Sequence, residues 1–217
     1  MCYSVMVKQD LTYLSKLFGA KVKQEEFDGL SKPSLLDSKV PKYTPRLYPG
    51  YFGPVLFTED KVPQLAPMRY RLRPAGSSEE VPSKYNMFNA RLDALEVRPS
   101  WQRLVGRKHG IVVLERFYEW VEDKNTGRKK VISFFPQKSS EIYVPILWDE
   151  WTDGQTKLKS FALITDEPPP EVLSAGHDRC PISLNLEGSH LWLSCQRPFD
   201  ALKHRSVEVF GHEASVP

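Results

Sequence analysis

The spacing of apolar residues along the first fifty positions predicts a short strand, a helix and a long loop. After an apolar run at residues 4–7, leucines and a phenylalanine recur at residues 11–18 on one helical face. Asp10 precedes this segment as an N-cap and Gly19 follows it as a stop. Residues 32–54 are rich in proline, glycine and tyrosine without periodicity, so we expect an ordered loop wrapped on the body of the protein.

The remainder of the chain is patterned mainly as short strands. Apolar and β-branched runs predict strands at residues 54–57, 68–73, 110–122, 130–135, 142–148, 159–165 and 207–210. Prolines or a serine mark three short helices, expected within residues 99–106, 169–176 and 186–193. We therefore expect an α+β fold, a single domain over residues 1–217, with a curved or barrel-like, mostly antiparallel sheet and helices around it.

Composition narrows the class of protein. Of 217 residues, 41% are hydrophobic and 26% charged, as in soluble globular proteins. The three cysteines, Cys2, Cys180 and Cys195, have no CxxC spacing, which argues against a disulfide framework or a zinc ribbon. The chain opens without the pattern of a secretory signal, and no apolar run is long enough for a membrane span. We expect a cytoplasmic protein that needs no metal or cofactor and has no membrane partner.

A net charge of +3 permits a nucleic-acid partner, and only local clustering can identify one. If residues 68–73 form a regular strand, Arg69, Arg71 and Arg73 share one face, a stripe suited to phosphates. A solvated face with carboxylate partners explains the same pattern equally well.

Two polar groups stand out within apolar segments. Asn86, Asn89 and Arg91 lie in "YNMFNARLDAL", where asparagine in a turn is usually structural. In "VVLERFYEWVE", Glu119 lies inside an apolar, aromatic strand, where burial favours the neutral carboxyl form and suits it to proton transfer. A structural glutamate paired with an arginine is the commoner explanation of such a residue.

A third polar group, "HDRC", follows a predicted helix end at Gly176. His177 and Asp178 there are consistent with a metal corner, a catalytic histidine with an orienting aspartate, or a polar turn. Further metal ligands at suitable spacing are not evident. A serine hydrolase is also unsupported, because the sequence contains no GxSxG elbow.

Taken in order, four features resemble one family: Cys2 behind Met1, "NAR" at residues 89–91, "FYEW" at residues 117–120 and "HDR" at residues 177–179. It is the SRAP family, the SOS-response-associated peptidases, whose members shield abasic sites in single-stranded DNA by covalent attachment. The resemblance spans residues 2 to about 184. It implies a monomer that binds single-stranded DNA with abasic sites, associated with the nucleoid if the protein is bacterial.

The resemblance also implies roles for single residues. Cys2 would be the amino-terminal nucleophile, forming a thiazolidine crosslink after Met1 is removed; Glu119 would be the acid/base group, His177 would assist at the sugar, and Asn89 would contact the pocket. Arg91 and Arg179 would hold phosphates, and Thr165 would lie near the same cleft. Arg69, Arg71 and Arg73 would extend the basic groove, and Tyr85 and Phe88 would stack or wedge the strand.

The chain departs from the usual family pattern at several positions. Tyr3 and Ser4 stand where most members have glycine and a DNA-touching arginine, and the tryptophan wedge expected before the asparagine motif is absent. The resemblance implies an enzyme, an abasic-site crosslinking protein with lyase or autopeptidase-like activity. Two other functions stay open: an N-terminal-cysteine peptidase that cleaves itself, and a non-catalytic module that binds single-stranded DNA.

Overall fold

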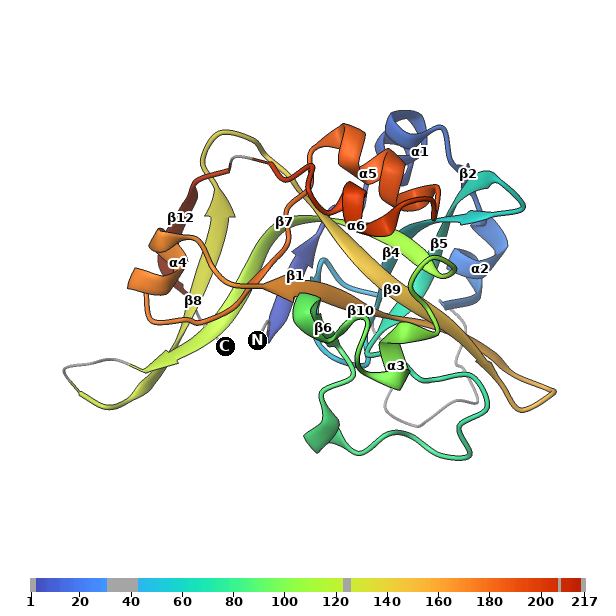
Figure 1. Cartoon of the computed structure of the whole chain (residues 1–217), viewed down its shortest axis with the longest axis horizontal. Helices are drawn as coiled ribbons and strands as arrows, with labels where there is room; N and C mark the ends of the chain where they lie inside the picture. Colours follow the sequence, from blue (N-terminus) through green and yellow to red (C-terminus); the bar gives the residue numbers. More distant parts are fainter. Residues whose placement is uncertain (1–2, 31–42, 123–125, 207, 216–217) are drawn as a thin grey trace.

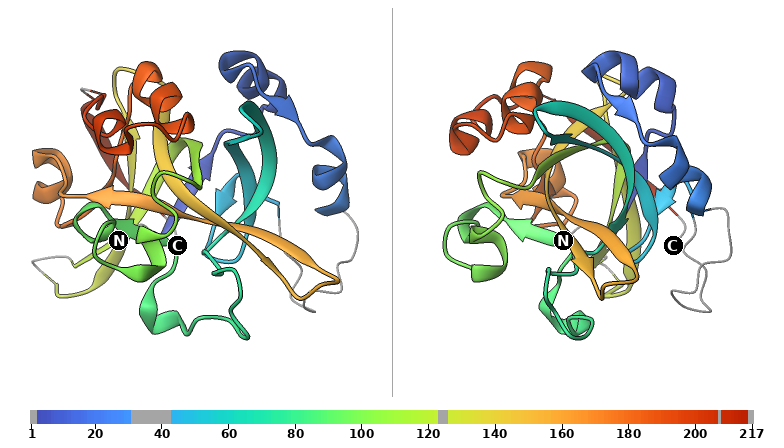
Figure 2. Two further views of the ribbon diagram at one scale, coloured as in Figure 1. Left: turned by 45° about the vertical axis from the view of Figure 1, so that its right-hand side comes forward. Right: turned by 90° about the vertical axis from the view of Figure 1, so that its right-hand side faces the viewer.

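Five strands close into a barrel in the structure, a computed structural model that describes residues 3–30, 43–122, 126–206 and 208–215. Their bounds are β4 (Phe52–Glu59), β5 (Val62–Tyr70), β7 (His109–Glu122), β9 (Ile142–Thr152) and β10 (Lys157–Asp166). The order around the ring is β10-β5-β4-β7-β9, and β9 returns to β10. Neighbours in the ring are antiparallel except β10 and β5, a short parallel pair. The right-hand view of Figure 2 looks down the axis of this barrel.

Strand β7 continues beyond the barrel and builds a second sheet region. Its first half pairs with β9 and β4, and its second half with β1 (Ser4–Val7) and β8 (Lys129–Pro136). The outer neighbours are β3 (Arg46–Leu47) beside β1 and β12 (Phe210–Ser215) beside β8. Figure 1 shows β7 crossing from the barrel to the β8–β12 extension.

The halves of β7 are separated by a β-bulge. Val7 of β1 pairs with Leu114, whereas Met6 pairs with Arg116, so Glu115 is an extra residue on β7. The bulge changes which residues face inward: Val112 and Leu114 belong to the inner core before it, and Phe117 and Val121 after it.

Short strands and helices complete the described chain. The strands are β2 (Lys21–Val22), β6 (Asn89–Arg91) and β11 (Cys180–Pro181). The helices are α1 (Leu11–Phe18), α2 (Gln24–Leu30), α3 (Pro99–Gln102), α4 (Pro170–Ser174), α5 (Leu186–Leu193) and α6 (Pro198–Ala201), with the 3-10 turns η1 (Ser83–Tyr85) and η2 (Leu92–Ala94). None of the helices described has the length and apolarity needed to cross a membrane.

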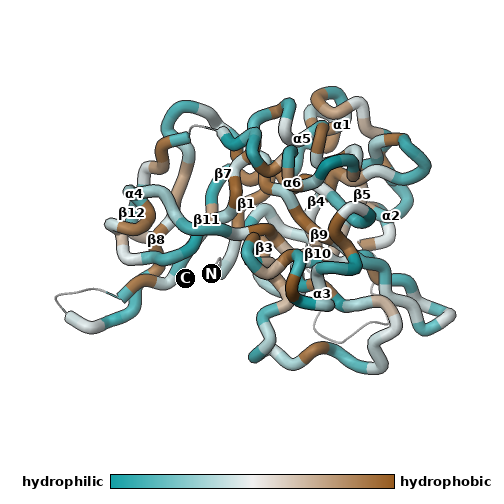
Figure 3. Tube along the Cα trace, viewed as in Figure 1, coloured by the Kyte–Doolittle hydropathy of each residue, from teal (hydrophilic) through white to brown (hydrophobic). Residues whose placement is uncertain are grey.

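Two apolar cores, an inner core inside the barrel and an outer core beneath the helices, lie on opposite sides of the sheet. Inward-facing residues such as Phe57, Met68 and Ile146 fill the barrel and extend to Phe117. Outward-facing residues of the same strands pack against helices, which contribute Phe18 of α1 and Trp192 of α5 to this second core. In Figure 3 the barrel strands contain most of the hydrophobic positions and the projecting turns are hydrophilic. The α+β, barrel-like fold predicted from the sequence is confirmed.

The predicted start and end of the first helix are also confirmed. The Asp10 carboxylate accepts a hydrogen bond from the backbone N–H of Tyr13 at 2.9 Å. Gly19 ends the helix with φ of 60°, a left-handed conformation that glycine adopts at little cost.

Three local predictions are wrong. The expected loop at residues 32–54 contains β3 and the start of β4, while residues 31–42 lie outside the described part. The "NAR" segment is strand β6, not a turn, because it pairs in parallel with β10. The last strand is Phe210–Ser215 instead of residues 207–210. Its sequence is mostly polar and therefore shows no strand pattern. Gly211, which has no side chain, leaves room for the Phe135 ring.

His109 is locked in a neutral form within the outer core. Its ring stacks on Trp192 with centroids 3.7 Å apart, Nδ1 contacts the Trp192 carbonyl at 2.9 Å, and Nε2 accepts from the Gly106 N–H at 2.8 Å. Burial lowers the pKa of His109 from 6.5 to about 4.

This shift predicts a loss of stability in acid. Between pH 6.5 and 4 the unfolded chain binds a proton that the folded chain excludes, so the free energy of unfolding falls as the pH falls, by about 3 kcal/mol in all. Urea unfolding of the wild type and of His109→Gln at pH 7 and pH 4.5 measures this change in the free energy of unfolding. The wild type should lose more stability than the variant, and equal losses would contradict the assignment.

Candidate functional site

The centre of the candidate site is the buried carboxyl group of Glu119. It lies on the second half of β7, on the inward face with Phe117 and Val121, and its side chain has no exposed surface. The Nε2 atom of His177 lies 3.1 Å from Glu119 Oε2. A histidine is therefore one partner of the strand glutamate.

The chain reverses sharply to bring His177 to this position. Gly176, with φ of 102°, ends the segment after α4 and lies over Val121 of β7. The other ring nitrogen, Nδ1, is 2.9 Å from the carbonyl oxygen of Arg179 and 3.3 Å from its backbone nitrogen. Arg179 thus offers Nδ1 both an acceptor and a donor, so either tautomer of His177 has a partner and a proton can be exchanged with Glu119.

Strands β6 and β10 carry the other predicted pocket residues. Asn89 pairs with Leu163 and Arg91 with Thr165 in the parallel register. Because Leu163 belongs to the inner core, Asn89 and Thr165 face the same interior as Glu119. Both are buried, and among the described residues the Thr165 hydroxyl has no hydrogen-bond partner.

Arg91, at the end of β6, is exposed, and Arg179 is partly exposed. Arg91 makes two hydrogen bonds with the Asp93 carboxylate. Bonding to Arg91 lowers the pKa of Asp93, and the charge of Arg179 lowers it further. Asp178 also interacts with Arg91. The two predicted phosphate-holding arginines are thus brought close together by the fold, although residues 91 and 179 belong to distant segments.

The first described residues of the chain run alongside Glu119's strand. Ser4 pairs with Tyr118, and the Tyr3 N–H donates to the Tyr118 carbonyl at 3.0 Å. Arg46 donates to Ser4 Oγ at 3.1 Å and stacks over the Tyr118 ring at 3.9 Å. Cys2 itself lies outside the described residues. Arg46 is not among the site residues predicted from the sequence, because it is an isolated arginine in a segment predicted to be a loop.

Comparison with known proteins identifies the family of this chain. The sequence profile of the SOS response associated peptidases, SRAP, matches residues 1–213. The chain belongs to the SRAP family. It is 26% identical over 174 residues to the abasic site processing protein YobE of Bacillus subtilis, an alignment covering 78% of each chain. It is 27% identical over 175 residues to YoqW of the same organism, another abasic site processing protein, with 78% and 76% covered.

Solved structures share the fold of this SRAP protein. A crystal structure of a protein from Bacteroides thetaiotaomicron matches it with a TM-score of 0.75 at 16% identity, covering 98% of this chain and 91% of the other. A protein from Bordetella bronchiseptica matches with a TM-score of 0.72 at 15% identity over the full length of both.

The predicted arginine stripe of this SRAP protein is wrong as a geometric feature. Strand β5 ends at Tyr70, and Arg71 takes φ of 110°, so the alternation does not reach residue 73. Arg69 bonds Glu80 at 2.6 Å, Arg73 is 3.7 Å from the same carboxylate, and Arg71 donates to the Val81 carbonyl. The carboxylate partner expected for a structural strand face is therefore present, and a DNA-binding role for the three arginines stays a prediction.

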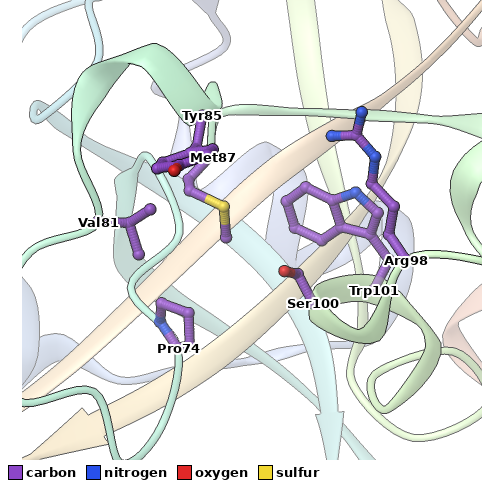
Figure 4. A pocket seen from close by; sticks show the side chains of 7 residues that line it. All are labelled: Pro74, Val81, Tyr85, Met87, Arg98, Ser100 and Trp101. Atoms are coloured by element: carbon purple, nitrogen blue, oxygen red, sulfur yellow. The ribbon is translucent and has the colours of Figure 1, made fainter.

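Of the two predicted stacking residues, Tyr85 is the more accessible. Its side chain is 56% exposed, whereas Phe88 packs against Tyr70 at a ring distance of 5.7 Å. Tyr85 helps to line a hollow of about 150 Å³ beneath the 71–88 segment (Figure 4). The other lining residues are Pro74, Val81, Met87, Arg98, Ser100 and Trp101. Glu119 and His177 are not among them.

The two described cysteines are poor thiolates. Burial and the neighbouring Glu119 charge raise the pKa of Cys180 well above its ordinary value. Burial also raises the pKa of Cys195. Neither thiol is suited to nucleophilic attack, because the thiolate is the reactive form.

The buried Thr165 hydroxyl gives a prediction for this SRAP site. A hydroxyl without a partner opposes folding, so the isosteric change Thr165→Val should stabilise the protein by about 1 kcal/mol or more. Thermal unfolding measures the change, with Thr12→Val at an exposed position of α1 as the control. Destabilisation by Thr165→Val would mean that the hydroxyl has a structural partner.

Proposed function

We propose that this protein is a covalent sensor of abasic sites in single-stranded DNA and that Cys2, once Met1 is removed, is its nucleophile. The observation that carries the proposal is the buried Glu119–His177 pair beside the first described residues of the chain. Membership of the SRAP family and the names of the abasic site processing relatives support the substrate.

The electrophile is the ring-opened aldehyde of an abasic deoxyribose. A lysine amine, with a pKa of about 10.4, is nearly all protonated at neutral pH, whereas an α-amine at about 7.7 to 8.0 is partly neutral. The α-amine of Cys2 therefore adds to the aldehyde carbon more readily, and loss of one water gives an imine.

The thiol of the same residue then completes the reaction. It adds to the imine carbon while its proton passes to the nitrogen, closing a five-membered thiazolidine. The step is intramolecular and so gains from high effective concentration, and it removes the imine from hydrolysis. Cys180 and Cys195 lack an adjacent α-amine and have raised thiol pKa values.

Glu119 and His177 provide the proton transfers. Opening the sugar requires that one proton is added to the ring oxygen and another is removed from the anomeric hydroxyl. Loss of water from the carbinolamine requires a further proton on the departing hydroxyl group. Glu119 is suited to these transfers, and His177 assists ring opening by donating to or orienting the sugar oxygen. Asn89 and Thr165 contribute polar groups to the pocket, and Arg91 and Arg179 hold flanking phosphates.

Substitution of Cys2 tests the nucleophile. The protein without Met1 is incubated with a single-stranded oligonucleotide carrying one abasic site. Intact mass should show an adduct equal to the sum of the two masses less one water, stable to heating. Cys2→Ser keeps the amine and should give only an imine that is lost on heating unless reduced with borohydride, because a hydroxyl closes the ring less readily.

Controls separate this thiol from the others. Cys180→Ala and Cys195→Ala should both form the stable adduct. An unimpaired heat-stable adduct in Cys2→Ala would overturn the proposal. In purified protein that retains Met1, the Cys2 nitrogen is in a peptide bond, so this protein should form no heat-stable adduct.

Removal of the carboxylate tests the acid/base assignment. Glu119→Gln should slow adduct formation by about 100-fold or more, since a positioned acid/base group contributes roughly 10²- to 10⁴-fold. Binding to an oligonucleotide with a tetrahydrofuran analogue, which has no aldehyde, should be unchanged within about twofold. The exposed Glu79→Gln is the matched control. An adduct rate equal to that of the wild type would exclude Glu119 from the chemistry.

The same assays distinguish the two other functions. A peptidase acting through Cys2 predicts an acyl intermediate and hydrolysis of a peptide without DNA. A non-catalytic module predicts salt-sensitive binding with equal affinity for intact and abasic DNA, because phosphate contacts do not report the lesion.

A further inference from the structure

Four aromatic side chains form a continuous row at the start of β1. Tyr51 and Tyr48 have ring centroids 5.5 Å apart, Tyr48 and Tyr3 are 5.6 Å apart, and Tyr3 and Trp120 are 5.5 Å apart. The rings meet edge to face, at interplanar angles of 64° to 79°. Three separate segments of the chain supply this aromatic row.

The aromatic row passes around the end of β1 from one side of the sheet to the other. Tyr51 packs against the inner core, the side on which Glu119 lies. Trp120 is the residue after Glu119 and faces the opposite side of β7. Tyr3 lies between them and is the residue that follows Cys2. The row therefore connects the two sides of the sheet next to the strand that carries Glu119.

A positive charge is fixed beside the aromatic row. The Arg46 guanidinium lies over the Tyr118 ring at 3.9 Å and 5.2 Å from the Tyr48 ring centre, and it donates to Ser4 Oγ. Stacking on aromatic faces with a cation beside them is the usual means of holding single-stranded nucleic acid.

Exposure also favours a ligand over simple core packing. Trp120 is 37% exposed, whereas the other four tryptophans are at most 8% exposed. The remaining tryptophans, Trp101, Trp148, Trp151 and Trp192, all lie in the cores or against them. Trp120 is therefore the described tryptophan whose indole is accessible to a ligand, and the three partly exposed tyrosines of the row adjoin it.

We propose that the aromatic row stacks nucleobases that flank the abasic residue of single-stranded DNA, with Arg46 contacting a phosphate between them. This inference rests on the proposed function and specifies which part of the substrate is bound beside the lesion. It differs from the prediction of Tyr85 and Phe88 as stacking groups, which lie on the 71–88 segment. The occupant is a base in a flexible strand, because a base within a duplex has both faces covered by its neighbours.

The test uses two single-stranded oligonucleotides that cannot react with an amine. Both carry a central tetrahydrofuran residue; one has normal bases on either side, and in the other the two flanking positions are also tetrahydrofuran. Anisotropy gives the affinity and tryptophan emission gives the stacking signal. Wild-type protein should bind the base-flanked strand about tenfold more tightly, consistent with the value of a stacked base, and its emission should be quenched.

Variants assign the effect to the aromatic row. Trp120→Leu should bind both strands with nearly equal affinity, with an unchanged dependence on salt because stacking involves no phosphate. Tyr48→Leu should reduce the preference and Tyr48→Phe should keep it. Tyr13→Leu, which removes a similarly exposed ring on α1, should behave as the wild type. Trp120→Phe should retain the preference but lose the quenching, which keeps the test decisive if Trp120→Leu fails to fold.

The outcomes separate this inference from the proposed function. A wild-type protein that binds both strands equally, or binds the base-flanked strand without quenching, would overturn the stacking role and leave the Cys2 reaction intact. Normal quenching with no adduct on true abasic DNA would overturn the Cys2 reaction alone. Failure to bind either strand, together with no adduct on true abasic DNA, would overturn both.

Discussion

The Glu119 carboxyl group has no contact with solvent, and removing such a group from water costs several kcal/mol unless partners inside the protein hold it. The partner is an imidazole from a different part of the chain, so β7 and the turn after α4 have to meet. This requirement accounts for the left-handed Gly176, for the contact of that turn with Val121, and for the double partner that Arg179 gives to the ring. A buried carboxyl group paired with an imidazole is the arrangement that the proposed acid/base role requires.

The closed barrel and the candidate site occupy different parts of the fold. The closed part of the barrel is filled by apolar side chains and provides rigidity, while the second half of β7 leaves the ring and carries the polar groups. Asn89 and Thr165 approach from β6 and β10, on the wall of the same interior. Rigid strands on both sides restrict the movement of the groups between them, which is what proton transfer over a short distance demands.

Much of this could be predicted from the sequence, because the signals were local. Period-2 runs gave the long strands, and the Asp10 and Gly19 caps gave α1. Glu119, Asn89 and His177 were identified by the order of four short motifs. What could not be predicted depends on pairing between distant segments: β3 has only two residues and no periodicity, and β6 is recognisable as a strand only through its pairing with β10. The arginine stripe failed because a change of backbone conformation at Arg71 leaves no mark in the residue pattern.

The extra residue at Glu115 has a consequence for how this site tolerates change. Strand side chains alternate, so one inserted position reverses the orientation of everything that follows until the strand ends. With a regular β7 the indole of Trp120 would point into the barrel and the carboxyl group of Glu119 would point into solvent. Loss of the bulge with every residue retained would therefore reverse the side chains from residue 116 onward, whereas deletion of Glu115 itself would restore regular alternation and leave Glu119 facing the core.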